Sequence, residues 1–187
     1  ERELEARVLR ALSGPIREAL PFLLGQARAV EAFDLALAGA RLAREEGLSR
    51  PVLHDGDVRI EKGRHLPTEG LCATLDTPYT PLEASFAGGP TVVFGSNMGG
   101  KTVVLKTLAF LQIAAQAGLF VPASRFATRV FRHLHYVGEG RSREDGRGLS
   151  GFGFEIRQFN EAHADFGDDT LALFDEFART TSSGEAE

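Results

Sequence analysis

One short segment, Gly95-Ser-Asn-Met-Gly-Gly-Lys101-Thr102, limits the possible folds of this chain more sharply than any other. It has the spacing G-x-x-x-x-G-K-T, and an apolar run at residues 91–94 precedes it. Strong helix formers without Gly or Pro follow at residues 103–117. A strand, a glycine-rich turn and a helix in this order are typical of a loop that binds phosphate. We call residues 95–102 the P-loop segment; a glycine-rich turn with an incidental lysine would not account for its flanks.

Each part of the P-loop segment has a role in holding a nucleoside triphosphate. Its glycines let successive backbone N–H groups point inward, where the helix N-terminus adds its positive dipole. We expect Lys101 to reach the β- and γ-phosphates and the Thr102 hydroxyl to bind Mg²⁺. The predicted nucleotide-binding residues are Gly95, Ser96, Asn97, Met98, Gly99, Gly100, Lys101 and Thr102.

A second apolar run ends on two acidic residues. Residues 170–174 are typical of a buried parallel strand, and Asp175 and Glu176 follow directly. Open α/β sheets bind ligands at the carboxyl ends of their strands. We expect Asp175 to hold Mg²⁺ together with Thr102, and Glu176 to act as the general base that polarises the attacking water. Alone, the pattern is equally typical of a solvated acidic pair; together with the P-loop segment it predicts a catalytic ATPase-type site.

Ser150 comes just before a helix predicted at residues 153–165. A serine in this position is most often an N-cap, which accepts hydrogen bonds from the first turn of the helix. The alternative is a hydroxyl that the helix presents to the γ-phosphate bound by a neighbouring subunit. The residues alone leave both interpretations open.

The composition and the hydrophobic periodicity of the chain change near residue 49. Residues 1–48 are rich in Ala, Leu, Glu and Arg with apolar residues at helical spacing, and Ser13-Gly-Pro15 divides them into two predicted helices, the second bent near Pro21. Residues 49–187 predict an α/β domain with a mixed or parallel sheet flanked by helices. Its expected elements are strands at 52–53, 58–60, 72–75 and 91–94, a helix to about 117, one or two strands within 127–137, a mobile loop at 138–148, the helix at 153–165 and the strand at 170–174.

Composition excludes several functional classes. A formal net charge of −5 excludes nucleic-acid binding by bulk electrostatics, so any DNA contact needs a local basic patch or another domain. A single cysteine rules out an internal disulfide and fits a reducing cytoplasm, and no segment has the pattern of a signal peptide or membrane span. The chain starts without Met and ends in a polar stretch, from which we expect a piece of a longer protein, truncated at its C-terminus.

Five motifs, in order from about residue 50 to the end, resemble the ATPase region of the MutS family. Residues 60–65 are similar to the family's I-x-x-G-R-H, the P-loop segment to G-P-N-M-G-G-K-S/T, residues 120–123 to F-V-P-A, residues 150–155 to S-T-F-x-x-E, and residues 175–181 to D-E-x-x-R-G-T. The chain departs from the family pattern in having Ser96 for proline, Gly151 for threonine and Thr180 for glycine. Residues before 50 resemble the end of the family's helical core.

The resemblance implies a P-loop ABC-type ATPase that uses ATP and Mg²⁺ and forms a homodimer through this domain. It implies that Ser150 serves the partner's nucleotide and that Glu176 drives hydrolysis in its own site. Tyr79 falls near the position where the family stacks the adenine, although an exposed tyrosine in a turn is an equally good interpretation. The chain ends before the family's switch histidine, so we expect the isolated chain to be weakly active.

The implied function is an ATP-binding and ATP-hydrolysing module of a DNA mismatch repair or recombination protein. In such a protein the nucleotide state of the dimer moves domains that bind double-stranded DNA and are absent from this chain. An alternative comes from residues 175–181, which resemble MutS-like proteins encoded beside cobalamin-dependent lysine aminomutases. That resemblance implies an ATP-driven reactivating chaperone with no role on DNA.

Overall fold

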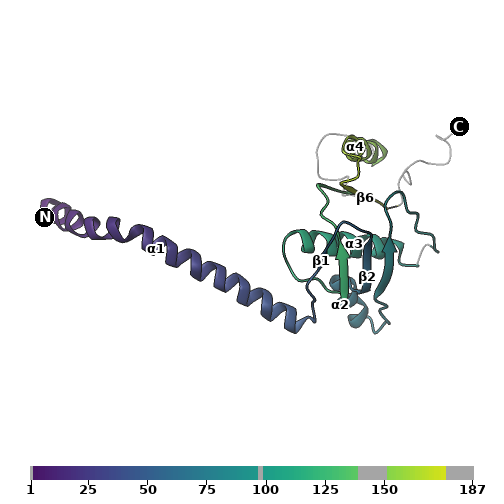
Figure 1. Cartoon of the computed structure of the whole chain (residues 1–187), viewed down its shortest axis with the longest axis horizontal. Helices are drawn as coiled ribbons and strands as arrows, with labels where there is room; N and C mark the ends of the chain where they lie inside the picture. Colours follow the sequence, from purple (N-terminus) through teal and green to yellow (C-terminus); the bar gives the residue numbers. More distant parts are fainter. Residues whose placement is uncertain (1, 97–98, 139–150, 176–187) are drawn as a thin grey trace. The chain divides into compact units, whose positions relative to one another are not determined.

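The N-terminal part of the chain is a single helix. The structure, a computed structural model, describes residues 2–96, 99–138 and 151–175. The chain divides into two compact units, residues 1–45 and residues 46–187, and α1 (Arg2–Glu45) makes up the first (Figure 1). The prediction of two helices was wrong, because α1 continues through Pro15 and Pro21. An interior proline removes one hydrogen bond and costs about 3 kcal/mol, and the Ala, Leu, Glu and Arg residues around both prolines offset that cost with their high helix propensity.

The second unit contains a four-stranded mixed sheet in the order β1-β4-β2-β3 (Figure 1). β1 pairs with β4 in parallel, and β2 pairs with both β3 and β4 in antiparallel orientation. Its strands are β1 (Val52–Leu53), β2 (Val58–Gly63), β3 (Leu82–Phe86) and β4 (Arg125–Thr128). The architecture is therefore mixed α/β, as the sequence predicted, and the strands expected at 52–53 and 58–60 are confirmed.

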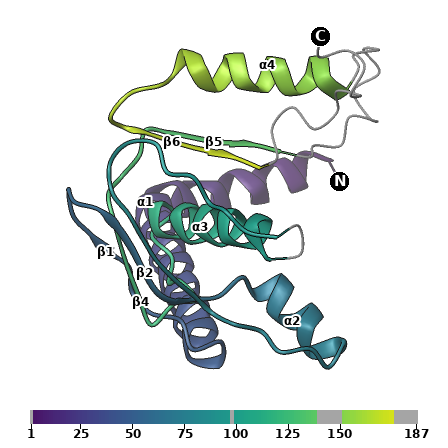
Figure 2. The same cartoon turned by 90° about the vertical axis from the view of Figure 1, so that its right-hand side faces the viewer.

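The hydrophobic core lies between this sheet and α3 (Lys101–Gln116) (Figure 2). Ile60 from β2, Phe126 from β4 and Leu111 from α3 are each at most 2% exposed. Gly63 lets the helix approach β2 closely, since a Cβ atom there would lie 2.5 Å from the Ile60 Cγ2 and 3.2 Å from the Leu111 Cδ1. The core thus fixes α3, and with it the P-loop segment, to the sheet.

Residues 120–123 close the same core from the other end of α3. Val121 is fully buried and pairs with Ser49 through an isolated bridge. The Pro122 carbonyl accepts a hydrogen bond of 2.7 Å from the Arg64 N–H. The F-V-P-A sequence therefore joins the chain before β1 and the end of β2 to the segment that leads into β4.

The short helix α2 (Leu66–Thr74) occupies part of a predicted strand. The strand expected at residues 72–75 was wrong, because residues 72–74 form the last turn of α2. Pro67 in the first turn has a backbone angle suited to a helix start, and Glu69 in the same turn complements the helix dipole. A short apolar run does not by itself distinguish a strand from a buried helical turn.

A second, two-stranded parallel sheet consists of β5 (His133–Val137) and β6 (Thr170–Phe174), which α4 (Gly151–Ala164) connects. Figure 2 shows this sheet between α4 and α3. Phe159 from α4 lies 5.8 Å from the Phe174 ring, and Phe166 lies 6.3 Å from the same ring, measured between ring centroids. These three aromatic rings hold α4 on β6. The predictions of a helix near 153–165 and of a parallel strand at 170–174 are confirmed, whereas most of the loop predicted at 138–148 lies outside the described residues.

The strand predicted at residues 91–94 is absent from the described structure. Val92 is 69% exposed and Phe94 is 88% exposed, and no described residue pairs with this segment as a strand. A strand needs a neighbouring strand whose backbone N–H and C=O groups can pair with its own. The residues at 91–94 are of the types found in strands, but their apolar pattern does not say whether such a neighbour exists. Within the described residues, no helix has both the length and the apolar character needed to cross a membrane.

Candidate nucleotide-binding site

The described residues of the P-loop segment lead directly into α3. The Gly99 N–H donates a hydrogen bond of 2.9 Å to the Ser96 carbonyl, and a Cβ atom on Gly99 would lie 3.1 Å from that oxygen. Gly100 is the N-cap of α3 and has φ of 79°, which favours glycine. No side chain among the described residues caps this end of α3. The first N–H groups of a helix lack partners within the helix, so those of α3 can bind an anion.

Lys101 bends back over the P-loop segment. Its Nζ donates hydrogen bonds to two backbone carbonyls, at 3.0 Å to Gly95 and at 2.8 Å to Ser96. Both acceptors are neutral backbone groups of the P-loop segment. Phosphate oxygens would be stronger acceptors, because their negative charge attracts the ammonium group more strongly than the dipole of a neutral carbonyl does. Lys101 thus lies against the backbone of Gly95 and Ser96, and its contact with phosphate stays a prediction.

Thr102 and Asp175 meet although 73 residues separate them. The Thr102 hydroxyl in the first turn of α3 donates a hydrogen bond of 3.1 Å to the Asp175 Oδ1. Asp175 follows directly after β6, and its backbone N–H donates to the Val137 carbonyl at the end of β5, at 2.7 Å. The structure therefore brings together the two residues that the sequence predicted as Mg²⁺ ligands.

Tyr136 is a second partner of the Asp175 carboxylate, and the sequence analysis missed it. The Tyr136 hydroxyl donates a hydrogen bond of 3.1 Å to the Asp175 Oδ2. Burial raises the pKa of Tyr136 well above its usual range, and the charge and hydrogen bond of Asp175 raise it further, so the phenol stays a neutral donor. Gly138 leaves space for this contact, because a Cβ atom there would lie 3.0 Å from the Asp175 Cβ. No sequence motif marks this tyrosine.

Two glutamines on α3 tie the helix to the connection between β4 and β5. The Gln112 side chain is fully buried and donates to the Arg129 carbonyl at 2.9 Å, and its Oε1 accepts from the Thr128 hydroxyl at 2.6 Å. The Gln116 side chain exchanges hydrogen bonds with the backbone of Phe131, at 2.7 and 3.0 Å. These contacts couple α3 to the segment that enters β5. The only sequence signal was a pair of glutamines four residues apart in an apolar helix.

Tyr79 contacts the backbone of the segment that resembles I-x-x-G-R-H. Its hydroxyl accepts a hydrogen bond of 2.7 Å from the His65 N–H. The His65 ring packs edge-on against Phe110 of α3, with 6.3 Å between ring centroids. Burial lowers the pKa of His65, and the nearby charge of Lys106 lowers it further. Tyr79 thus has a structural contact, and stacking on an adenine ring stays a prediction.

The remaining predicted site residues lie outside the described residues. They are Asn97 and Met98 of the P-loop segment, Ser150 before α4, and Glu176 after Asp175. The roles assigned to them from the sequence stay predictions. Glu176 is nonetheless the next residue after Asp175, so the chain itself limits how far it lies from the Thr102–Asp175 contact.

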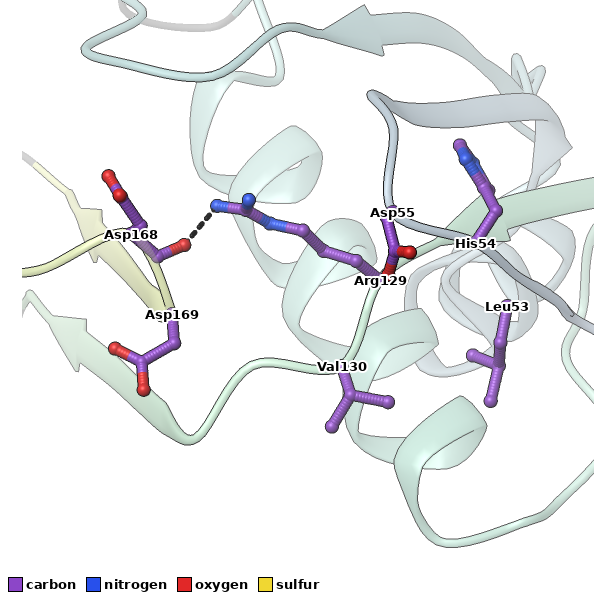
Figure 3. Close-up of a pocket in the computed structure, with 7 residues that line it drawn as sticks. All are labelled: Leu53, His54, Asp55, Arg129, Val130, Asp168 and Asp169. Carbon is purple, nitrogen blue, oxygen red and sulfur yellow. Dashed lines mark hydrogen bonds between the residues drawn. The ribbon is translucent and has the colours of Figure 1, made fainter.

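A pocket of about 510 Å³ opens elsewhere in the second unit, where the parallel strands β1 and β4 end (Figure 3). Its lining residues are Leu53, His54, Asp55, Arg129, Val130, Asp168 and Asp169. Arg129, the lining cation in Figure 3, donates to the Asp168 carbonyl and lies 4.9 Å from the centroid of the Phe131 ring. Three aspartates line the same space and would repel phosphate. The pocket is therefore a poor candidate for the nucleotide site.

Comparison with known proteins gives a match that includes both halves of the candidate site. Residues 91–186 match the family model described as MutS domain V. The chain is 35% identical over 184 residues to the endonuclease MutS2 of Solidesulfovibrio magneticus, and the aligned region covers 97% of this chain and 23% of that protein. It is 31% identical over 159 residues to the DNA mismatch repair protein Msh3 of Dictyostelium discoideum, covering 81% of this chain and 11% of that protein. A DNA mismatch repair protein MutS of Bacillus velezensis is 27% identical over 183 residues, covering 97% and 21%. The chain thus spans between 11% and 23% of the length of these relatives.

Proposed function

The chain belongs to the MutS family, since MutS domain V matches residues 91–186, and on this premise we propose that it is the ATP-binding and ATP-hydrolysing module of a MutS-family protein. The module has the P-loop ABC-type ATPase fold, and it binds ATP and Mg²⁺ at the P-loop segment. One observation carries the proposal. The hydroxyl of Thr102 and the carboxylate of Asp175 meet at 3.1 Å, at the N-terminus of α3 and the carboxyl end of β6.

The same contact supports Mg²⁺ as the metal. Mg²⁺ prefers oxygen ligands in octahedral geometry and keeps several of its waters. In the proposed complex the Thr102 hydroxyl, and through water the Asp175 carboxylate, would hold Mg²⁺, which would supply positive charge to the phosphates. Tyr136 fixes the second oxygen of Asp175 through its 3.1 Å hydrogen bond, so the carboxylate is oriented before the metal arrives. Lys101 exchanges the two carbonyls of the P-loop segment for phosphate oxygens.

The proposed reaction is attack of water on the γ-phosphate. Glu176 accepts a proton from the water as its oxygen bonds to phosphorus, and the bond between the γ-phosphorus and the β–γ bridging oxygen breaks to leave ADP. Lys101 and the amides at the start of α3 stabilise the charge that develops on the phosphate oxygens. This chemistry needs no covalent enzyme intermediate. It requires Glu176 within hydrogen-bond reach of the water, as its position next to Asp175 allows.

We place the module in a homodimer that acts on double-stranded DNA. Ser150 would complete the nucleotide site of the partner subunit, and the nucleotide state of the dimer would move domains outside this chain. The names of the relatives, mismatch repair proteins and an endonuclease, support a DNA context. They lend no support to the alternative of a reactivating chaperone for a cobalamin-dependent aminomutase, and the proposal does not include it.

Titration with a fluorescent ATP analogue tests the proposal. Lys101→Ala removes two charged hydrogen bonds to phosphate and should weaken binding about 100-fold or more. Lys106→Ala is the matched control, since this exposed lysine lies on the same helix, and it should bind within about twofold of the unchanged chain. In the intact protein, Glu176→Gln should keep binding and lose turnover. Unchanged affinity in the Lys101 variant would refute the proposed site.

A further inference from the structure

Two histidines and an aspartate come together near the start of β5, and none of the three is assigned to the nucleotide. His133 and His135 alternate along β5 and therefore point to the same face of the strand. Their rings are parallel, with 4° between planes and 6.4 Å between centroids. Asp165 follows directly after α4 and faces both rings. One potential ligand atom from each of the three residues lies within 4.8 Å of the others.

The separations between these atoms suit a small metal ion. The Asp165 Oδ2 lies 3.3 Å from the His133 Nδ1 and 2.9 Å from the His135 Nε2. Two ligand atoms bound at about 2.1 Å to a tetrahedral ion lie about 3.4 Å apart. The two distances from the aspartate therefore differ from this spacing by about half an ångström or less, and the two histidine nitrogens lie within 4.8 Å of each other. All three side chains are between 23% and 36% exposed, which leaves an entry path and room for a water ligand.

The backbone holds the three residues in place without a metal. The Thr170 hydroxyl donates to the Asp165 carbonyl, and the Asp165 N–H donates to the Ala162 carbonyl at 3.1 Å. β6 starts at Thr170 and pairs with His133 in register, so the aspartate is tied to the same parallel pair that carries the histidines. A site that is ordered before binding loses less conformational entropy when the ligand arrives.

We propose that His133 Nδ1, His135 Nε2 and Asp165 Oδ2 bind one divalent transition-metal ion of the Zn²⁺ type, with water in the fourth position. Two imidazoles and one carboxylate favour Zn²⁺, Co²⁺, Ni²⁺ or Cu²⁺, whereas Mg²⁺ and Ca²⁺ favour oxygen ligands alone. The ion links the end of α4 to β5, and through Thr170 to the start of β6. The site is independent of the proposed ATPase function and of the Mg²⁺ expected at Thr102 and Asp175.

Calorimetric titration of the chain with Zn²⁺, in the absence of nucleotide, tests the site. One equivalent should bind, and a large excess of Mg²⁺ should not displace it. Asp165→Asn keeps the size of the side chain and should weaken binding about tenfold or more, as should His135→Gln. His163→Gln is the matched control, because this exposed histidine on α4 lies outside the cluster, and it should leave the affinity unchanged. Absence of one-equivalent binding, or equal affinity in the Asp165 and His163 variants, would overturn the proposal.

A second measurement needs no substitution and so does not depend on the folding of a variant. Paramagnetic Co²⁺ broadens or shifts the NMR signals of nearby protons, and one equivalent should affect the ring signals of His133 and His135 before those of His163 and His54. Zn²⁺ added first should prevent the change. Simultaneous broadening of all histidine signals would indicate unspecific surface binding and would overturn the proposal, as would ring signals of His133 and His135 that do not respond.

Discussion

Replacing Tyr136 with phenylalanine removes a single oxygen atom from the candidate Mg²⁺ site. That oxygen donates a hydrogen bond of 3.1 Å to the Asp175 Oδ2. A hydrogen bond to a charged group contributes about 1.5–3 kcal/mol when it is buried. Tyr136 is 37% exposed, so solvent screening reduces the contribution to about 1 kcal/mol. Tyr136→Phe should therefore lower the free energy of unfolding by about 1 kcal/mol, which is about fivefold in the equilibrium constant.

A double-mutant cycle in urea isolates this contact from other effects of the substitution. Tyr136→Phe, Asp175→Asn and the double variant are unfolded in parallel, and the coupling free energy should be about 1 kcal/mol. Tyr79 is the other tyrosine of the chain and accepts a hydrogen bond from the His65 backbone. A cycle between Tyr79→Phe and Asp175→Asn should give a coupling near zero. Equal couplings in the two cycles, or none for Tyr136, would refute the geometry on which the Mg²⁺ site depends.

The pH dependence of the same variant has a definite sign. The pKa of Tyr136 is raised in the folded state, first by burial and then by Asp175. A group whose pKa rises on folding stabilises the protein below its unfolded pKa, here 10.0, and loses that contribution as pH rises above it. The stability difference between the unchanged chain and Tyr136→Phe should therefore be constant from about pH 7 to pH 9 and shrink above about pH 10.

Three further outcomes follow from the packing around α3. Gly63→Ala would place a methyl group 3.2 Å from Leu111 and still closer to Ile60, and should lower the free energy of unfolding by about 1–3 kcal/mol. An unchanged midpoint of urea unfolding would contradict the close approach of α3 to β2. Burial, and then the charge of Lys106, lower the pKa of His65, so its contribution to stability is present above pH 6.5 and should be lost as the pH falls below that value. In thermal unfolding, the melting temperature of His65→Gln should fall less than that of the unchanged chain over this range. Gln112→Leu leaves buried hydrogen-bonding groups without partners and should cost about 2 kcal/mol or more in urea unfolding, while a neutral result would mean that the buried network contributes no net stability.

The elements around the candidate site were predictable because their patterns are long or strongly marked. Residues 101–116 contain helix formers without interruption after a glycine pair, and residues 170–174 are an apolar run that ends abruptly on charge. Both were placed within two residues of their observed bounds. The pairing of Thr102 with Asp175 followed from the two motifs together, since parallel strands and the helices after them bring such ends to one edge.

The wrong predictions share one physical cause, the dependence of short segments on their partners. Residues 72–75 and 91–94 are apolar runs of four residues, which suit a strand, a helical turn or an unpaired segment according to what lies beside them. Pro15 and Pro21 were expected to end or bend a helix, but the strong helix formers around them offset the cost of each proline, and the helix continues. In each case the neighbouring residues decided the outcome.

Other contacts between distant residues, which no motif marks, could not be predicted from the sequence. Tyr136 meets Asp175 across 39 residues, and His135 meets Asp165 across 30 residues. A single sequence contains no periodicity that relates such positions, so the tyrosine and the histidine cluster were found only in the folded chain. Gln112 is an intermediate case, because its polar side chain in an apolar helix was visible but its partner Thr128 was not.

The bond between Thr102 and Asp175 also has a kinetic consequence. It closes a loop of 73 residues. Contacts so distant in sequence form late in folding, because the chain must lose the entropy of loop closure before the contact can stabilise it. During synthesis the P-loop segment leaves the ribosome well before residue 175, so the growing chain passes through a stage in which the helix of this segment has no acidic counterpart. Competence to bind a metal-chelated nucleotide would then appear abruptly, with completion of β6, and would report the final step of folding.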